Sequence, residues 1–221
     1  MQRSEPLAVD LAGIARAAVK RALDVVLSGL ALVLLGPFLM LVALAVRLDS
    51  DGPVLFRQQR IGRGGTRFTC LKFRTMVPDA DPGVHQRAFA RVVAGQSVSD
   101  DSRSPFKLVN DPRVTRVGAL LRRTSLDEMP QLWNVLRGEM SLVGPRPAIP
   151  YELQHYQPWQ HQRHRVKPGI TGLWQVYGRG TMAFDEMMAL DVRYAREWTV
   201  WLDVKLLALT IPATIMQRGA R

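Results

Sequence analysis

Cysteine is nearly absent from this chain, and that scarcity narrows the classes of protein it can belong to. The one cysteine, Cys70, excludes an internal disulfide and any zinc site built from several cysteines. Its setting, RFTCLKF, has the composition of a β-strand, so we expect Cys70 to pack in the interior rather than to act as a nucleophile. The sequence also has no internal repeat and no low-complexity tract.

Acidic residues are few beside basic ones, with 19 Asp and Glu against 30 Lys and Arg and a formal net charge of +11. This balance indicates an anionic partner: nucleic acid, anionic lipid or a phosphorylated substrate. Aromatic residues make up only 7% of the chain, mostly outside basic stretches, and no nucleic-acid-binding motif is recognisable. We therefore expect no nucleic acid partner. A membrane-anchored protein whose basic face holds anionic lipid or nucleic acid stays as an alternative of another class.

Charged residues are missing altogether from Val25 to Val46. As a straight helix this segment would be roughly 33 Å long, enough to cross the hydrocarbon core of a bilayer. The long preceding stretch and the lack of a clear cleavage site argue against a removable signal peptide. The sequence therefore predicts a membrane anchor, with a buried core helix as the weaker alternative.

The middle of this segment is divided by Gly36 and Pro37, and proline bends a helix because it removes a backbone hydrogen bond. Basic residues flank both ends, with Lys20 and Arg21 before the segment and Arg47 after it. Because basic flanks tend to stay in the cytoplasm, a re-entrant helix-break-helix fits better than a span. We expect a leader over 1–19, a re-entrant anchor over 20–50 and a cytoplasmic domain over 51–221.

The remainder of the chain predicts a mainly α fold with a small β-hairpin, of the α+β class. Strand-like runs at 54–60 and 67–73 enclose three glycines and indicate the hairpin. Helices are expected at about 85–94, 116–123, 130–137 and 182–198. The apolar segment 200–216 is expected to be an interfacial amphipathic helix broken at Pro212, with a buried core helix as the alternative.

Two adjacent acids, Asp127 and Glu128, stand out in the basic stretch RRTSLDEMPQLWNV. One interpretation is a capping box in which Ser125 and Glu128 satisfy backbone N–H groups of a new helix. Pro130 argues against it, because proline prefers the first position of a helix and not the fifth. The acids are then expected just before a helix over 130–137, where backbone donors can also hold phosphate.

This pair suggests chemistry on a phosphate. A carboxylate can attack phosphorus and split a transfer into two steps, and Mg²⁺ with arginines can neutralise the phosphate charge. Asp127 and Glu128 are candidate Mg²⁺ ligands because hard cations prefer carboxylate and phosphate oxygen. Arg122, Arg146 and Arg179 are candidate phosphate contacts, although any one of them can equally be a solvated surface charge. A second acid pair, Asp185-Glu186, is expected on a solvated helical face.

Four long motifs make the chain similar to a known family: KRALDVVLSGLALVLLGPF, GPVLFRQQRIGRGGTRFTCLKFRTM, DPRVTRVGALLRRTSLDEMPQLWNVLRGEMSLVGPRP and VKPGITGLWQVYGRG. The chain resembles the bacterial sugar transferases, the small monotopic phosphoglycosyl transferases, from about residue 20 to residue 210. The third motif is long and highly specific.

The resemblance implies an enzyme that moves a sugar-1-phosphate from a UDP-sugar to polyprenol phosphate at the bacterial inner membrane, with its catalytic domain in the cytoplasm. It implies Asp127 as the nucleophile, Glu128 as its partner, and Arg122, Arg146 and Arg179 as phosphate contacts, with Mg²⁺ as cofactor. Many relatives have Ser-Pro where this chain has Gly36-Pro37, which removes a hydroxyl near the bend. The sugar, the polyprenol and the formation of a homodimer are not readable from the sequence.

Overall fold

The computed structural model describes residues 11–81, 83–98, 111–178 and 182–215. The elements within these ranges are α1 (Leu11–Asp49), β1 (Leu55–Ile61), η1 (Arg63–Gly65), β2 (Arg67–Phe73), α2 (Gly83–Val93), α3 (Arg116–Thr124), η2 (Leu126–Glu128), α4 (Gln131–Arg137), β3 (Ser141–Val143), η3 (Pro150–His155), η4 (Gln160–Arg165), β4 (Gly169–Thr171), α5 (Leu173–Tyr177), α6 (Phe184–Glu197) and α7 (Val200–Ile215).

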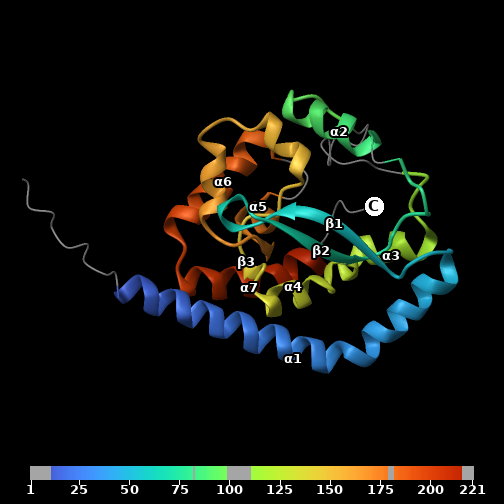
Figure 1. Ribbon diagram of the computed structural model, residues 1–221, viewed down its shortest axis with the longest axis horizontal. Coiled ribbons are helices and arrows are strands. Elements are labelled where there is room, and N and C mark those ends of the chain that lie inside the picture. Colours follow the sequence, from blue (N-terminus) through green and yellow to red (C-terminus); the bar gives the residue numbers. More distant parts are fainter. Residues whose placement is uncertain (1–10, 82, 99–110, 179–181, 216–221) are drawn as a thin grey trace, which may run out of the picture.

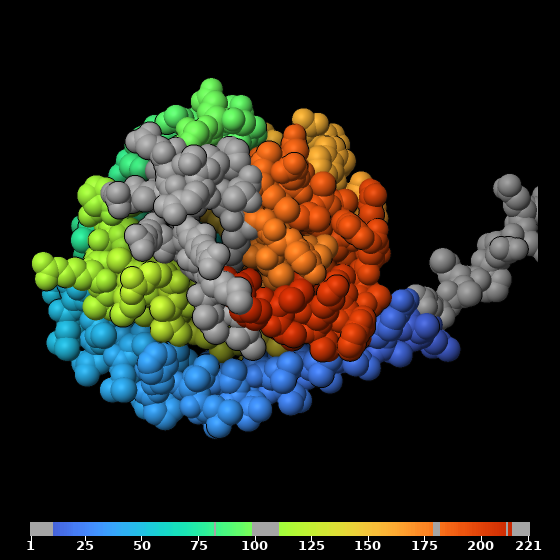
Figure 2. Space-filling view, turned by 180° about the vertical axis from the view of Figure 1, so that it is seen from behind, coloured from blue at the N-terminus to red at the C-terminus, as the bar shows by residue number. Residues whose placement is uncertain are grey.

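The helix α1 lies along one side of the domain, beneath α4 and α7 in Figure 1 and as a band along the lower edge in Figure 2. It begins at Leu11, inside the predicted leader, and continues without interruption through Pro37. The expected break is therefore absent, and Figure 1 shows a bend in a continuous helix instead. One missing hydrogen bond bends a helix without ending it when the neighbouring turns are intact.

Along α1, apolar side chains around the bend point away from the protein. Val33, Leu34, Met40 and Leu41 are each at least 66% exposed, and a side chain at Gly36 would meet nothing within 4 Å. By length and composition α1 is able to cross a membrane, and only 11% of its most apolar stretch is buried. Exposed apolar surface of this extent indicates membrane association.

The antiparallel hairpin of β1 and β2 was predicted nearly to the residue, with Leu55 opposite Phe73 and Ile61 opposite Arg67. Cys70 is 1% exposed and packs with Phe68, Val135 and Met140, so its predicted structural role is confirmed. A second sheet, the short parallel pair of β3 and β4, was not predicted. The backbones approach closely at two glycines, which leave room because they have no side chain. A Cβ on Gly169 would lie 2.1 Å from the backbone nitrogen of Gly144.

The predicted helices all form within one or two residues of their expected ends, as α2, α3, α4 and α6. The last helix, α7, continues through Pro212, so the predicted break there is wrong. Its Leu206 is fully buried against Val143, Leu173 and Tyr194, whereas Trp201 is 76% exposed. The helix thus has one face in the core, as the buried-helix alternative predicted, and an exposed apolar residue on another face, whose position at a membrane interface stays a prediction.

Candidate active site

The acid pair lies in a tight turn between two helices. α3 ends at Thr124, and Ser125 takes a left-handed conformation, φ 58°, that redirects the chain into η2. A non-glycine residue in this region carries backbone strain, which is most often retained at functional sites. The side chain of Ser125 does not cap the turn, and Pro130 stands directly before α4. The capping-box alternative is therefore wrong, and the acids precede the helix as predicted.

Asp127 is buried, with only 8% of its surface exposed. Burial raises the pKa of its carboxyl to about 6, because the charged form loses its hydration, and the neighbouring anion Glu128 acts in the same direction. The cations of Lys72 and Arg122 oppose this shift. A carboxylate that is poorly hydrated and still mostly ionised at neutral pH is suited to attack an electrophile.

Glu128 is held by a lysine that the sequence interpretation missed. Lys72 Nζ lies 2.6 Å from Glu128 Oε1, with both side chains about one-quarter exposed. Lys72 comes from β2, where the two-residue period places it on the same face as buried Phe68 and Cys70. The signal in the sequence that could have identified Lys72 was a lysine on the inward face of a predicted strand. Its charge stands close enough to influence both acids.

Arg122 comes from the last turn of α3 and is held by Thr75, whose Oγ1 accepts a hydrogen bond of 2.9 Å from Arg122 Nε. Burial lowers the pKa of the guanidinium, and the carboxylate of Asp127 partly offsets this. The contact needs close packing of α3 on the backbone of Thr75, since a Cβ on Gly118 would lie 2.2 Å from the Thr75 carbonyl oxygen. Glycine at position 118 therefore helps to bring Arg122 to the acid pair.

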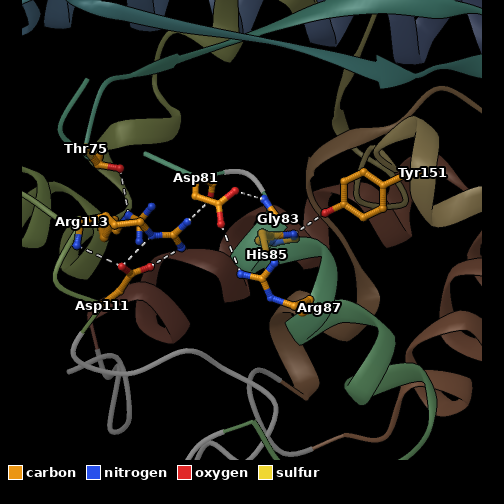
Figure 3. A network of polar contacts seen from close by, with 9 residues as sticks. Thr75, Asp81, Gly83, His85, Arg87, Asp111, Arg113 and Tyr151 are labelled. Carbon is orange, nitrogen blue, oxygen red and sulfur yellow. Dashed lines mark hydrogen bonds and ion pairs between the residues drawn. The ribbon is translucent and has the colours of Figure 1, made fainter. Parts of the chain in front are cut away.

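Polar contacts continue from Thr75 toward α2 (Figure 3). Arg113 forms a two-pronged pair with Asp111, at 2.9 and 2.6 Å, and also donates to the carbonyl of Asp81. Asp81 in turn accepts from the backbone of Gly83 at the start of α2. Further along, His85 contacts the hydroxyl of Tyr151. α2 thus links the segment around Arg122 with the segment around Tyr151.

Arg146 lies in the extended segment that follows β3, flanked by Pro145 and Pro147. Its side chain is 33% exposed, and its Nη1 lies 3.3 Å from Oε1 of Glu152, which is buried. The charge of Glu128 acts on Arg146 and also on the nearby buried Arg60. The structure therefore groups Arg122, Arg146, Asp127 and Glu128 around one charged region. The fifth predicted residue, Arg179, lies outside the described residues.

The family model for bacterial sugar transferases matches residues 15–217 of the chain. The chain belongs to the bacterial sugar transferase family. The match covers α1 from residue 15 onward as well as the acid pair, so the apolar part of this helix belongs to the matched unit.

The relatives of this chain differ in length. It is 41% identical to the exopolysaccharide production protein ExoY of Rhizobium meliloti over 91% of this chain and 87% of the relative. It is 45% identical to the undecaprenyl-phosphate glucose phosphotransferase of Komagataeibacter xylinus, over 91% of this chain and 36% of the relative. It is 44% identical to the UDP-glucose:undecaprenyl-phosphate glucose-1-phosphate transferase of Escherichia coli, over 91% and 41%.

The carboxylates that this sugar transferase offers as metal ligands suit Mg²⁺ better when a substrate phosphate supplies further oxygen ligands. Within the described ranges, no group of three or more His, Cys, Asp and Glu side chains is placed to hold a metal. Asp127 and Glu128 offer hard carboxylate oxygens, and Mg²⁺ is commonly held by one or two carboxylates together with substrate phosphates and waters. The residues present are therefore compatible with a Mg²⁺ ion that arrives with a diphosphate.

Both halves of α1 are fixed to the domain that follows it in the chain. In the first half, Arg21 donates at 2.6 Å to the carbonyls of Val135 and Leu136 at the end of α4, and Asp24 accepts from the backbone nitrogen of Leu142 at 2.9 Å. In the second half, Asp49 accepts from the backbone nitrogen of Val117 in α3 at 3.0 Å. Val42 and Val46 also pack against Phe73 and Leu121. The segments before and after Pro37 thus contact the same domain.

Proposed function

We propose that this protein transfers a sugar-1-phosphate from a UDP-sugar to polyprenol phosphate, giving polyprenol-diphosphate-sugar and UMP. The reaction would be the first membrane step in assembling a bacterial glycoconjugate. The observation that carries the proposal is the buried Asp127, in a strained turn between the cations of Arg122 and Lys72. Family membership and the names of the relatives support the same reaction class.

In the proposed mechanism a carboxylate oxygen of Asp127 attacks the phosphorus that carries the sugar. The bond from this phosphorus to the bridging oxygen breaks, and UMP leaves with that oxygen. An oxygen of polyprenol phosphate then attacks the same phosphorus, the bond to Asp127 breaks, and the carboxylate is restored. Burial of Asp127 supports this role, because water is kept from the carboxylate and its negative charge is poorly hydrated.

Glu128 is proposed to hold the cofactor together with Asp127. Mg²⁺, when bound, would neutralise diphosphate charge and orient the donor. Lys72 keeps Glu128 in a fixed position through their ion pair of 2.6 Å. Arg122 and Arg146 are proposed to contact phosphate oxygens, because guanidinium groups bind them with two parallel hydrogen bonds. Arg179 is proposed for the same role from its motif alone.

The anchor is proposed to enter the cytoplasmic leaflet and return, as a monotopic element bent at Gly36 and Pro37. Contacts of both halves of α1 with the same domain support this topology, since one domain lies on one side of the bilayer. The exposed apolar residues around the bend would then enter the lipid. This placement brings a lipid acceptor and a soluble donor to one interface, which is a gain in proximity.

The proposal is tested by measuring UMP with and without acceptor. Protein in detergent receives Mg²⁺ and each of a panel of UDP-sugars, first without polyprenol phosphate. We expect up to one UMP per chain with the correct donor and a phosphosugar adduct on the peptide containing Asp127, found by mass spectrometry. Adding polyprenol phosphate should then give continuous UMP release. UMP that forms only with both substrates, without an adduct, would indicate direct displacement; no UMP with any donor would overturn the proposed reaction.

A further inference from the structure

The segment that carries Arg146 is held in an unusual way. Proline has no backbone N–H, so Pro145 and Pro147 deprive the segment of two donors. The segment is held through its backbone carbonyls instead, and four successive carbonyls accept hydrogen bonds from four different partners. These are Gly169 N to Pro145 O at 2.9 Å, Arg163 Nη2 to Arg146 O at 2.7 Å, Arg60 Nη1 to Pro147 O at 2.7 Å, and Ile61 N to Ala148 O at 2.8 Å.

Two of these four donors are buried arginines, and burying a charged guanidinium to hold a loop costs hydration free energy. Arg163 is 2% exposed, and it forms a 2.5 Å ion pair with Asp191 of α6, whose side chain is 1% exposed. It also donates to the hydroxyl of Tyr156 at 2.5 Å. A buried ion pair stabilises a fold little compared with apolar packing, because both charges lose their water. Its presence behind Arg146 therefore suggests a role in placing that residue.

The charges around this segment do not cancel. Together with the Lys72–Glu128 pair, which also acts on this region, four cations face three carboxylates: Arg60, Arg146, Arg163 and Lys72 against Glu128, Glu152 and Asp191. Arg60 and Arg163 are buried, whereas the Arg146 side chain is one-third exposed. The excess positive charge can thus meet a solvent-borne ligand at Arg146. A phosphate group would complete the cluster.

We infer that Arg163, itself held by Asp191, is a positioning residue that fixes Arg146 for contact with a phosphate of the donor. Arg163 acts through the carbonyl of Arg146 and does not touch the substrate. Glu152 supports the same residue from the other side, since it pairs with the Arg146 side chain and accepts from the backbone of Ile149. The inference rests on the proposed function, because that function supplies the phosphate.

The test is a double-mutant cycle between Arg163→Lys and Arg146→Ala. Lysine keeps the positive charge beside Asp191, but its ammonium cannot reproduce the planar fork that reaches Tyr156, Asp191 and the Arg146 carbonyl together. We expect Arg163→Lys to lower kcat/KM for the UDP-sugar by ~10- to 100-fold, as small displacements of positioned groups do. In the Arg146→Ala background the same change should have less than about a twofold effect, because the residue it positions is gone.

The matched control is Arg193→Lys, which alters an exposed ion pair with Glu197 on the same helix as Asp191. It should leave kcat/KM unchanged within about twofold. Losses from Arg163→Lys and Arg146→Ala that simply multiply would overturn the inference, because a purely structural role gives independent effects. If Arg163→Lys does not fold, Asp191→Asn replaces it in the cycle and is judged by the same criterion.

UDP binding, measured by calorimetry on the same variants, separates this inference from the proposed function. Coupling between positions 163 and 146 in UDP affinity needs no turnover. Coupled binding without UMP release by the wild-type protein would uphold the positioning role and reject the proposed reaction. UMP release by the wild-type protein with independent effects at the two positions would do the reverse.

Discussion

The dipeptide Asp-Glu occurs twice in the chain, at 127–128 and at 185–186, in two different local structures. The first pair lies in a short turn, and its aspartate is buried beside Lys72 and Arg122. The second opens α6 and is exposed, as predicted. Identical residues therefore differ in environment, and the environment determines which pair has a poorly hydrated carboxylate next to a strained backbone.

The partners of the second pair explain its conventional role. Glu186 Oε2 accepts a hydrogen bond from the backbone nitrogen of Ala183 at 3.1 Å, and Asp185 accepts from Gln160 at 2.8 Å. Acids in the first turn also interact favourably with the helix dipole. The first pair does not cap a helix in this way, because the Ser125 side chain makes no capping hydrogen bond to η2 and α4 begins only after Pro130. Capping accounts for Glu186 and not for Glu128.

The largest expected effect separates the two aspartates by activity. Asp127→Asn should reduce UMP release by at least ~10³-fold, since a nucleophile that acts as part of a catalytic unit cannot be replaced by an amide. Asp185→Asn makes the same chemical change at an exposed site and should stay within about twofold of the wild-type protein. Both variants are compared at saturating UDP-sugar and polyprenol phosphate. Equal activity of the two variants would remove Asp127 from the role of nucleophile.

The next effect concerns Lys72, which forms an ion pair with Glu128 of the first pair. Lys72→Met should lower kcat/KM by ~10²-fold and move the acidic limb of its pH profile to higher pH. The wild-type limb is expected near pH 6, where Asp127 becomes protonated, and the Lys72 cation holds that pKa down. Arg137→Met, which removes an exposed partner of Glu139, is the control and should leave the limb in place. A limb that does not move in Lys72→Met would contradict the electrostatic coupling.

Stability should change in the opposite direction from activity at the first pair. A folded-state pKa raised from 3.8 to about 6 means that the fold is favoured while Asp127 is protonated and loses stability as pH rises through 6. The loss amounts to about 3 kcal/mol at neutral pH. Asp127→Asn should therefore melt at a higher temperature than the wild-type protein at pH 8, and the difference should disappear near pH 4. Asp185→Asn should show no such pH-dependent gain.

The comparison also shows what the sequence can predict. Local patterns were sufficient for the β1–β2 hairpin, for α3 and for the position of the acids ahead of α4, because each depends on neighbouring residues. The pairing of β3 with β4 was missed, since its two segments are distant in sequence and too short to show a period. Pro37 and Pro212 were expected to break helices, yet α1 and α7 continue through them, since one missing hydrogen bond bends a helix without ending it.

Within the site, the acids and arginines could be found from motifs, whereas their supports could not. Lys72 had a visible signal as a charged residue on the inward face of β2. Thr75 and Arg163 had none, because their roles arise from contacts across 47 residues to Arg122 and 17 residues to Arg146. Residues that touch a ligand are constrained by chemistry and form recognisable motifs. Residues that place them are constrained by the fold, which must be known first.

The smallest expected effect completes the comparison at the second pair. Glu186→Ala removes the acceptor for Ala183 N at the start of α6 and should lower the free energy of unfolding by about 0.5–1 kcal/mol, the usual contribution of a capping residue. Activity should stay near the wild-type level, because α6 is also held by buried Phe184, Met188 and Tyr194. Glu186→Gln, which retains an acceptor oxygen, is the matched control and should recover most of the lost stability. A large loss of activity in Glu186→Ala with an unchanged melting temperature would give the second pair a role in the reaction and end the distinction between the two.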